Sequence, residues 1–221
     1  GVAIVGLGLI GGSIAGALKI NGFKNIMGID TQNKAIEDAI NKDFVKLGDT
    51  EPENILPLAE IVIVCLYPKE TAEFIKKHMN DFKYKAVITD VSGIKLDLIN
   101  EINSCLRADL EFVGGHPMAG SHFRGFDHAN PNLFMDANYI ITPTDTSSLE
   151  AISKIKSLAK ILGCKSISEI NPGKHDEAMA LASHMPHITA LALIDMCDVR
   201  EMGALLGPRF KDATREAQIN S

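Results

Sequence analysis

Residues 1–12 read GVAIVGLGLIGG and contain a strand pattern, a glycine turn and the start of a helical pattern. Residues 1–6 form a run of small and β-branched residues that ends at a glycine, which is typical of a buried parallel strand. Residues 6–11 have the spacing G-x-G-x-x-G, which between a strand and a helix predicts a dinucleotide-binding turn. We expect Gly6 to make the tight turn, Gly8 to let backbone approach a pyrophosphate, and Gly11 to let the helix pack close to the strand.

The same pattern predicts which residues contact the cofactor. Amides at the start of the helix would bind the phosphates, and Asp30, at the end of the second predicted strand, would bond a ribose 2′-hydroxyl. Its carboxylate would repel the 2′-phosphate of NADP, and residues 31–33 include no arginine to hold one. NAD is therefore the expected cofactor; a glycine turn without a nucleotide is the alternative. The predicted cofactor contacts are Gly6, Gly8, Leu9, Ile10, Gly11 and Asp30.

Strand and helix patterns alternate along the first 170 residues. Short apolar runs separate amphipathic helix patterns of about ten residues, as in βαβ crossovers. Strands are expected at 1–6, 25–30, 61–66, 85–91, 111–113 and 138–142, with a further possible strand at 164–170; helices are expected after the glycine turn and at 34–44, 72–77, 96–102 and 147–162. This order predicts an α/β fold of the Rossmann type, with a doubly wound, mainly parallel sheet between helices.

The character of the chain changes after Asn171-Pro172-Gly173. From residue 174 to about 206, Ala, Leu and Met recur at helical spacing and no strand pattern is convincing. We therefore expect a dinucleotide-binding domain at 1–170 and, at 171–221, the start of an all-α domain for substrate binding and dimerisation. Since this helical part looks too short to close its own core, we expect that it is truncated here or completed in a homodimer.

Composition narrows the class of partner. Of the 221 residues, 46% are hydrophobic and 23% charged, which is ordinary for a soluble globular protein. Twenty-two Lys and Arg against 28 Asp and Glu give a net charge of −6, which argues against nucleic acid or an anionic membrane as partner. No apolar run reaches the ~18 residues of a membrane span, and the opening strand pattern leaves no signal peptide. Four scattered cysteines indicate reduced thiols. We expect a cytoplasmic enzyme with a small-molecule substrate.

Residues 114–120 read GGHPMAG and supply the candidate catalytic base. We expect His116 directly after a strand, at the edge of the sheet where parallel sheets bind ligands. Pro117 restricts its backbone to extended geometry, and the flanking glycines leave room for a substrate. Imidazole can accept a proton from a hydroxyl while hydride leaves the same carbon. The alternative is a loop histidine satisfied by backbone.

Four stretches together resemble the prephenate/arogenate dehydrogenase family. They are GLGLIGGS at 6–13, GHPMAGSHFRG at 115–125, His175-Asp176 with SHMPH at 183–187, and FKDATR at 210–215. The resemblance implies NAD-dependent oxidation and decarboxylation of prephenate to 4-hydroxyphenylpyruvate, in tyrosine biosynthesis, with His116 as the base for the ring hydroxyl. It also implies that Arg215 supplies a buried cation for the dianionic substrate, with Arg209 as the second choice.

The resemblance assigns further site residues. Ser92 would bond His116 or the substrate hydroxyl, although many members carry the serine one position later, where this chain has Gly93. Lys95 nearby is functional or simply solvated. Ser183 and His187 would contact substrate or cofactor, the alternative being a polar helix face interrupted by Pro186. Ser121 would reach the neighbouring active site, and His175 and Asp176 would orient their helix. A metal site is not expected, because the histidines lack a third ligand.

Other functions remain open on the sequence. Arogenate is an alternative substrate, since it shares the ring of prephenate. Another Rossmann dehydrogenase, acting on a 3-hydroxy acid or an imine, would place a catalytic lysine on the first helix of its second domain, where this chain has Lys174 and then histidines. A sensor module that binds NAD without chemistry would need neither the His-Pro loop nor the polar helix face.

Overall fold

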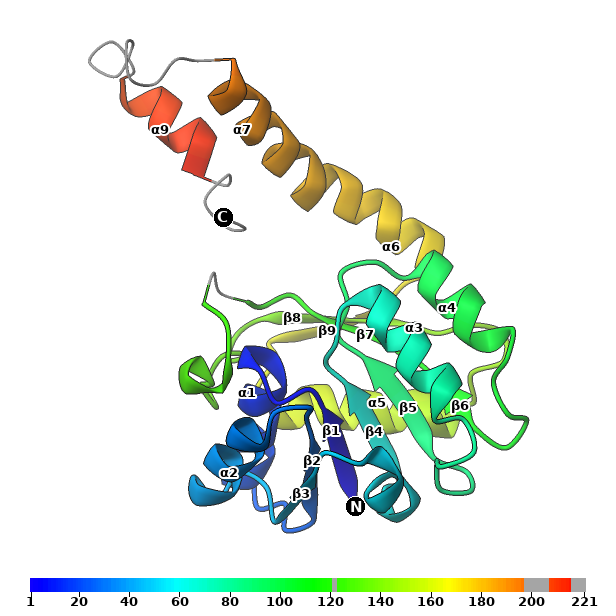
Figure 1. Cartoon of the computed structure of the whole chain (residues 1–221). Helices are drawn as coiled ribbons and strands as arrows, with labels where there is room; N and C mark the ends of the chain where they lie inside the picture. Colours follow the sequence, from blue (N-terminus) through cyan, green and yellow to red (C-terminus); the bar gives the residue numbers. More distant parts are fainter. Residues whose placement is uncertain (121–122, 197–206, 216–221) are drawn as a thin grey trace. The chain divides into compact units, whose positions relative to one another are not determined.

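The computed structural model describes residues 1–120, 123–196 and 207–215 (Figure 1). The chain divides into two compact units, Gly1–His175 and Asp176–Ser221. In the described residues, no helix is both long enough and apolar enough to cross a membrane.

The first unit is built on a six-stranded parallel sheet with the order β3-β2-β1-β4-β5-β6. The strands are β1 (Val2–Val5), β2 (Ile26–Ile29), β3 (Leu47–Asp49), β4 (Ile61–Val64), β5 (Val87–Asp90) and β6 (Glu111–Phe112). This arrangement confirms the predicted Rossmann-type sheet. The sequence did not predict β3, because it is a three-residue edge strand with one apolar side chain.

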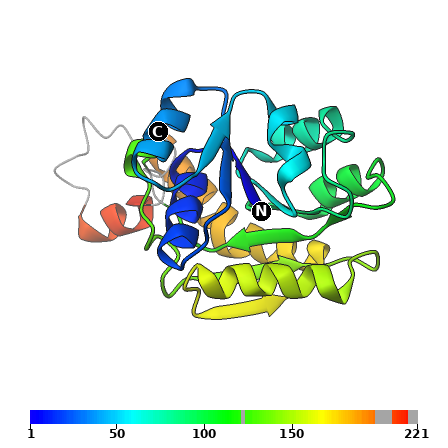
Figure 2. The ribbon, with the colours of Figure 1, turned by 90° about the horizontal axis from the view of Figure 1, so that it is seen from below.

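Helices cover both faces of this sheet. They are α1 (Leu9–Ile20), α2 (Asn33–Asn41), α3 (Pro68–Lys77), α4 (Leu96–Asn103) and α5 (Leu149–Ile161). In β1, Ile4 packs into a core with α1, α2 and α5, whereas Val5 packs into a core with α3 and α4. Figure 2 shows α5 along one side of the sheet and α3 with α4 on the other. Because successive side chains of a strand point to opposite faces of the sheet, β1 contributes to one hydrophobic core on each face.

A second, three-stranded sheet carries the candidate base. Its order is β7-β8-β9, with β7 (Gly114–Pro117) antiparallel to β8 (Asn138–Thr142) and β9 (Ser166–Glu169) parallel to β8. His116 follows the predicted strand β6, as expected, but it lies inside β7, opposite Ile140, a further strand that the sequence did not predict. Residues of the type Gly-Gly-His-Pro have little strand propensity. Gly115 is nevertheless required, because a Cβ there would lie 2.5 Å from the Tyr139 hydroxyl.

The second unit is helical in its described residues. The helix α6 (Pro172–Met179) begins in the first unit and continues without a break into the π-helical turn η4 (Ala180–His184) and α7 (Met185–Asp195); α9 (Pro208–Thr214) packs against α7. Pro186 does not interrupt this helix, in contrast to one alternative expected from the sequence. The π-helical turn lies directly before the proline, and such wide turns often occur at functional sites.

Candidate active site

The glycine turn has the geometry that a phosphate cradle needs. Gly6 has φ +85°, and a Cβ there would lie 2.7 Å from the Cys65 carbonyl oxygen. At Gly11 a Cβ would lie 1.9 Å from the Gly6 carbonyl oxygen, so only glycine lets α1 begin this close to β1. Gly8 is the N-cap of α1 and supplies no side chain, and a Cβ there would meet nothing within 4 Å. The amides of the first turn of α1, which includes Leu9 and Ile10, are therefore open to an anion.

Asp30 is held in one orientation at the end of β2. Its Oδ2 accepts a hydrogen bond from the Leu7 amide at 2.7 Å, and its Oδ1 accepts one from the Gln32 amide at 2.9 Å. The first bond ties the carboxylate to the glycine turn itself. Each oxygen retains a lone pair for a ribose hydroxyl, and the side chain is only partly buried.

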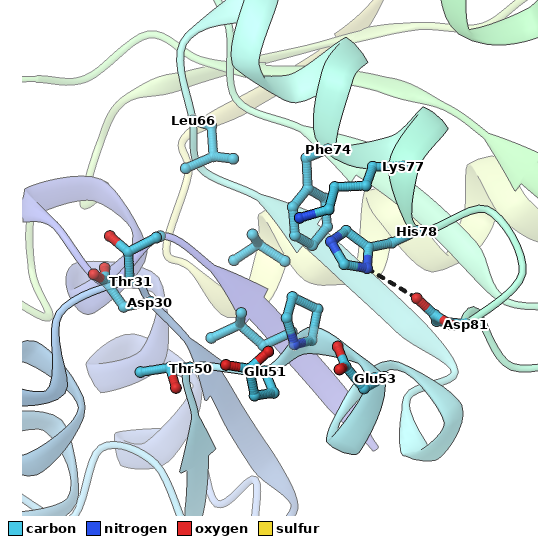
Figure 3. A pocket seen from close by; sticks show the side chains of 14 residues that line it. Asp30, Thr31, Thr50, Glu51, Glu53, Leu66, Phe74, Lys77, His78 and Asp81 are labelled. Carbon is cyan, nitrogen blue, oxygen red and sulfur yellow. Dashed lines mark hydrogen bonds and ion pairs between the residues drawn. The ribbon is translucent and has the colours of Figure 1, made fainter.

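A pocket of about 570 Å³ opens beside this carboxylate (Figure 3). Its apolar surface comes from β1, β2, η1 (Pro52–Asn54) and α3, and it is flanked by acidic groups and by one lysine. The lining residues are Val5, Gly6, Ile29, Asp30, Thr31, Thr50, Glu51, Pro52, Glu53, Leu66, Phe74, Lys77, His78 and Asp81. A largely apolar slot next to a fixed carboxylate and an open phosphate cradle fits the adenosine half of NAD. The carboxylates of Glu51 and Glu53 would add to the repulsion of a 2′-phosphate.

The candidate base forms a hydrogen bond with a second histidine. His116 Nδ1 lies 2.9 Å from His175 Nε2, and the two rings meet edge to face with centroids 5.2 Å apart. His175 is fully buried in α6, and its amide donates to the Asn171 carbonyl in the first turn. One proton occupies this bond. If His116 donates it, His116 Nε2 keeps its lone pair and can act as a base.

A buried ion pair is hydrogen-bonded to the strand that carries the candidate base. Asp90 and Lys95 are both fully buried, and Lys95 Nζ donates to Asp90 Oδ2 at 2.5 Å. Asp90 also accepts from the Ser92 amide at 2.9 Å and from the Gly115 amide at 3.2 Å. The pair therefore joins the loop after β5 to the strand that carries His116. This role of the pair was not predicted from the sequence, and the solvated alternative for Lys95 was wrong, because the side chain is fully buried. The signal in the sequence was a lysine five residues after a strand-terminal aspartate.

Ser92 does not bond His116. Its Oγ is buried and, in the described part of the chain, has no hydrogen-bond partner. At the next position, a Cβ on Gly93 would lie 3.7 Å from His116 Nε2. The hydroxyl expected beside the base thus sits one residue away from the position closest to the ring.

Three of the remaining predicted site residues belong to the second unit. Ser183 lies in η4 and is exposed, and His187 lies in the first turn of α7 and is half-buried. Arg215 caps the C-terminal end of α9 and is exposed, so the expected burial of this cation is absent from the described structure. Ser121 lies outside the described residues.

Neither thiol nor metal chemistry is indicated in the described residues. Cys65, Cys105 and Cys164 are free thiols, and Cys197 lies outside the described residues. Burial raises the pKa of the Cys65 thiol and raises that of Cys164 to about 11, which disfavours the nucleophilic thiolate in both. Within the same residues, no group of three His, Cys, Asp or Glu side chains could hold a metal ion.

Two family models match the chain. The nucleotide-binding domain of prephenate dehydrogenase matches residues 14–168, and the dimerization domain of prephenate dehydrogenase matches residues 171–220. Prephenate dehydrogenase of Bacillus subtilis is 32% identical over 223 residues, which cover 98% of this chain and 60% of that protein. The chain therefore spans about three fifths of the length of this relative.

Two solved structures are similar over nearly the whole chain. Prephenate dehydrogenase from A. aeolicus, in complex with hydroxyphenyl propionate and NAD⁺, is 30% identical with a TM-score of 0.88, covering 98% of this chain and 77% of that one. Arogenate dehydrogenase of Synechocystis is 31% identical with a TM-score of 0.87, covering 97% of this chain and 78% of that one. Because the first family model alone matches most of the residues, the resemblance seen in the sequence is confirmed, and the chain belongs to the prephenate dehydrogenase family.

Proposed function

We propose that this protein catalyses the NAD-dependent oxidative decarboxylation of prephenate to 4-hydroxyphenylpyruvate, a step of tyrosine biosynthesis. The observation that carries the proposal is the His116–His175 hydrogen bond, located in the same unit as a cofactor cradle of fitting shape. Membership of the family supports the substrate, as do the names of the relatives that cover nearly all of this chain.

In this reaction the protein supplies a base and an oriented site. When bound, NAD⁺ provides the hydride acceptor for the carbon that bears the ring hydroxyl. His116 Nε2 accepts the hydroxyl proton, and its Nδ1 donates to His175, which holds the ring and disperses the charge of the imidazolium. The C–C bond to the ring carboxylate breaks, CO₂ leaves, and the electron pair enters the ring. The ring oxygen then regains the proton from His116. Aromatisation drives the step, so positioning is the main contribution of the protein.

The substrate contacts are part of the same proposal. Ser92, with its buried hydroxyl, would bond the reacting oxygen, and Ser183, His187 and Arg215 of the second unit would bind the polar groups of the substrate. Ser121 would contribute to the active site of a partner subunit. The match to a dimerization domain supports a homodimer, and free thiols in the described residues support a reducing, cytoplasmic location.

Arogenate is the second candidate substrate. The Synechocystis arogenate dehydrogenase is about as similar to this chain as the A. aeolicus prephenate dehydrogenase, and the two substrates share the ring on which His116 would act. A 3-hydroxy acid or imine dehydrogenase is disfavoured, because α6 presents His175 rather than a lysine toward the base. An NAD-binding sensor would not need this histidine pair.

The test is NADH formation by the full-length protein with NAD⁺ and either prephenate or arogenate. We expect turnover with at least one of them, and its loss in His116→Asn while the affinity for NAD⁺ is retained. Tight NAD⁺ binding without turnover of either substrate would contradict the proposal and favour the sensor. Undiminished turnover by His116→Asn would refute the role of the base.

A further inference from the structure

The cofactor pocket contains a histidine whose hydrogen bonding is set by a neighbour. His78 follows the last residue of α3, and its Nδ1 lies 2.8 Å from Asp81 Oδ2. A carboxylate only accepts hydrogen bonds, so Nδ1 carries the proton. The imidazole is almost fully buried and packs on the Phe74 ring, with centroids 4.9 Å apart. In the neutral ring the other nitrogen, Nε2, is therefore an acceptor with a fixed direction.

This acceptor lies across the pocket from the ribose site. Figure 3 shows Asp30 and Thr31 on one side of the pocket, and Phe74, His78 and Asp81 on the opposite side. The free edge of the His78 ring is turned away from Asp81, toward the other lining residues. If the ribose binds at Asp30, the purine base extends into the apolar slot, toward His78. This step relies on the proposed function, because it places the adenosine half of NAD in this pocket.

We propose that His78, oriented by Asp81, is a specificity-determining residue that recognises the base of the dinucleotide. Its Nε2 accepts a hydrogen bond from the exocyclic 6-amino group of adenine, while Phe74 and Leu66 supply apolar surface for the ring. In a purine with a carbonyl at that position, the carbonyl oxygen and His78 Nε2 would both be acceptors, and no hydrogen bond could form between them. A buried acceptor without a donor is penalised more than a formed hydrogen bond is worth. His78 thus selects adenine dinucleotides over 6-oxopurine dinucleotides.

Calorimetric titration with NAD⁺ and with its hypoxanthine analogue tests this inference without relying on turnover. The analogue carries a 6-carbonyl in place of the amino group and, as a lactam, a hydrogen on N1. For the wild-type protein we expect NAD⁺ to bind about ten- to a hundredfold more tightly than the analogue. In His78→Asn, whose amide can still donate to Asp81 but does not reach the Nε2 position, this preference should shrink to within about twofold.

Three further variants separate the possible outcomes. His78→Phe, which fills the space without an acceptor, should lose the preference as well, and thermal unfolding shows whether either variant is folded. His128→Asn removes an exposed histidine of η3 (Phe126–His128) that does not line the pocket, and should keep the full preference. Glu53→Met removes another carboxylate acceptor that lines the pocket.

The failure of the inference and that of the proposed function give different results. If the wild-type protein binds neither dinucleotide, both are refuted. If it binds NAD⁺ and the analogue equally, or if a folded His78→Asn keeps the full preference, only the role of His78 is refuted. Loss of the preference in Glu53→Met alone would assign the recognition of the base to Glu53 instead.

Discussion

At the scale of single residues, the His116–His175 hydrogen bond decides whether the candidate base can act. One proton occupies this bond, and only the tautomer with the proton on His116 Nδ1 leaves Nε2 able to accept another. His175 can hold the His116 ring in one orientation because it is buried and its backbone is held in the first turns of α6. It is a positioning residue, since it acts through His116.

Replacements of His175 that differ in reach test this role. The oxygen of the amide in His175→Gln can take the place of Nε2 as acceptor, whereas His175→Asn is too short. We expect kcat of His175→Asn to fall about ten- to a hundredfold with little change in KM, and His175→Gln to recover much of the loss. Nitrogen NMR of His116 should show a proton on Nδ1 in the wild-type protein and in His175→Gln. Equal kcat in the two variants would contradict a positioning role.

Ser92 presents a buried hydroxyl that the described residues do not satisfy. Such a group lowers stability unless a ligand bonds it. Ser92→Ala should therefore leave the free energy of unfolding unchanged or raise it by about 1 kcal/mol, while kcat/KM falls about tenfold because the substrate loses a hydrogen bond. Both quantities are measured on the same preparation, by denaturant unfolding and by NADH formation.

Thr142 offers the matched control, because its Oγ1 is also buried without a partner in the described residues. Thr142→Val should give the same small change in stability and no loss of activity. A destabilised but fully active Ser92→Ala would show that the hydroxyl is structural.

At the scale of elements, the Asp90–Lys95 ion pair connects the parallel sheet to the second sheet. Asp90 ends β5, Lys95 precedes α4, and the Gly115 amide that bonds Asp90 belongs to β7. Removing one member of a fully buried pair leaves the other charge without compensation, which is more costly than removing both.

We therefore expect Lys95→Met to lower the free energy of unfolding by about 3–5 kcal/mol. The double variant with Asp90→Asn should recover part of this loss, because no unpaired charge remains. Urea unfolding of the single and double variants measures the coupling. Additive effects of the two substitutions would show that the pair contributes no coupling energy.

At the scale of the molecule, the described residues of the second unit expose several large apolar side chains. Its exposed apolar side chains are Leu181, Met185, Ile188, Leu191, Ile194 and Met196. An apolar surface of this kind marks an interface, and the family model for this part describes a dimerization domain.

The full-length protein should therefore sediment at twice its monomer mass, and Ile188→Asp should shift it toward the monomer. Since the cofactor cradle belongs to the first unit, the affinity of this variant for NAD⁺ should be retained. A monomer mass for the wild-type protein at all concentrations measured would refute the homodimer.

The sequence alone was sufficient to predict the parallel sheet, the helices that cover it and the glycine turn between β1 and α1. These features depend on local patterns: apolar runs of strand length, amphipathic spacing, and three glycines whose separations match one turn. The short strand β3 was missed because its edge position lets it form from three residues with a single apolar side chain. Its neighbours, rather than its own propensity, make it a strand.

The arrangement of the candidate active-site residues could not be predicted without the tertiary structure. His116 and His175 are 59 positions apart, and no pattern predicts that their ring nitrogens meet. The burial of Lys95 and the placement of His116 in β7 likewise result from packing against elements distant in the chain. Secondary-structure patterns report on near neighbours along the chain, whereas the protonation state and direction of a catalytic side chain are set by whichever group the fold brings against it.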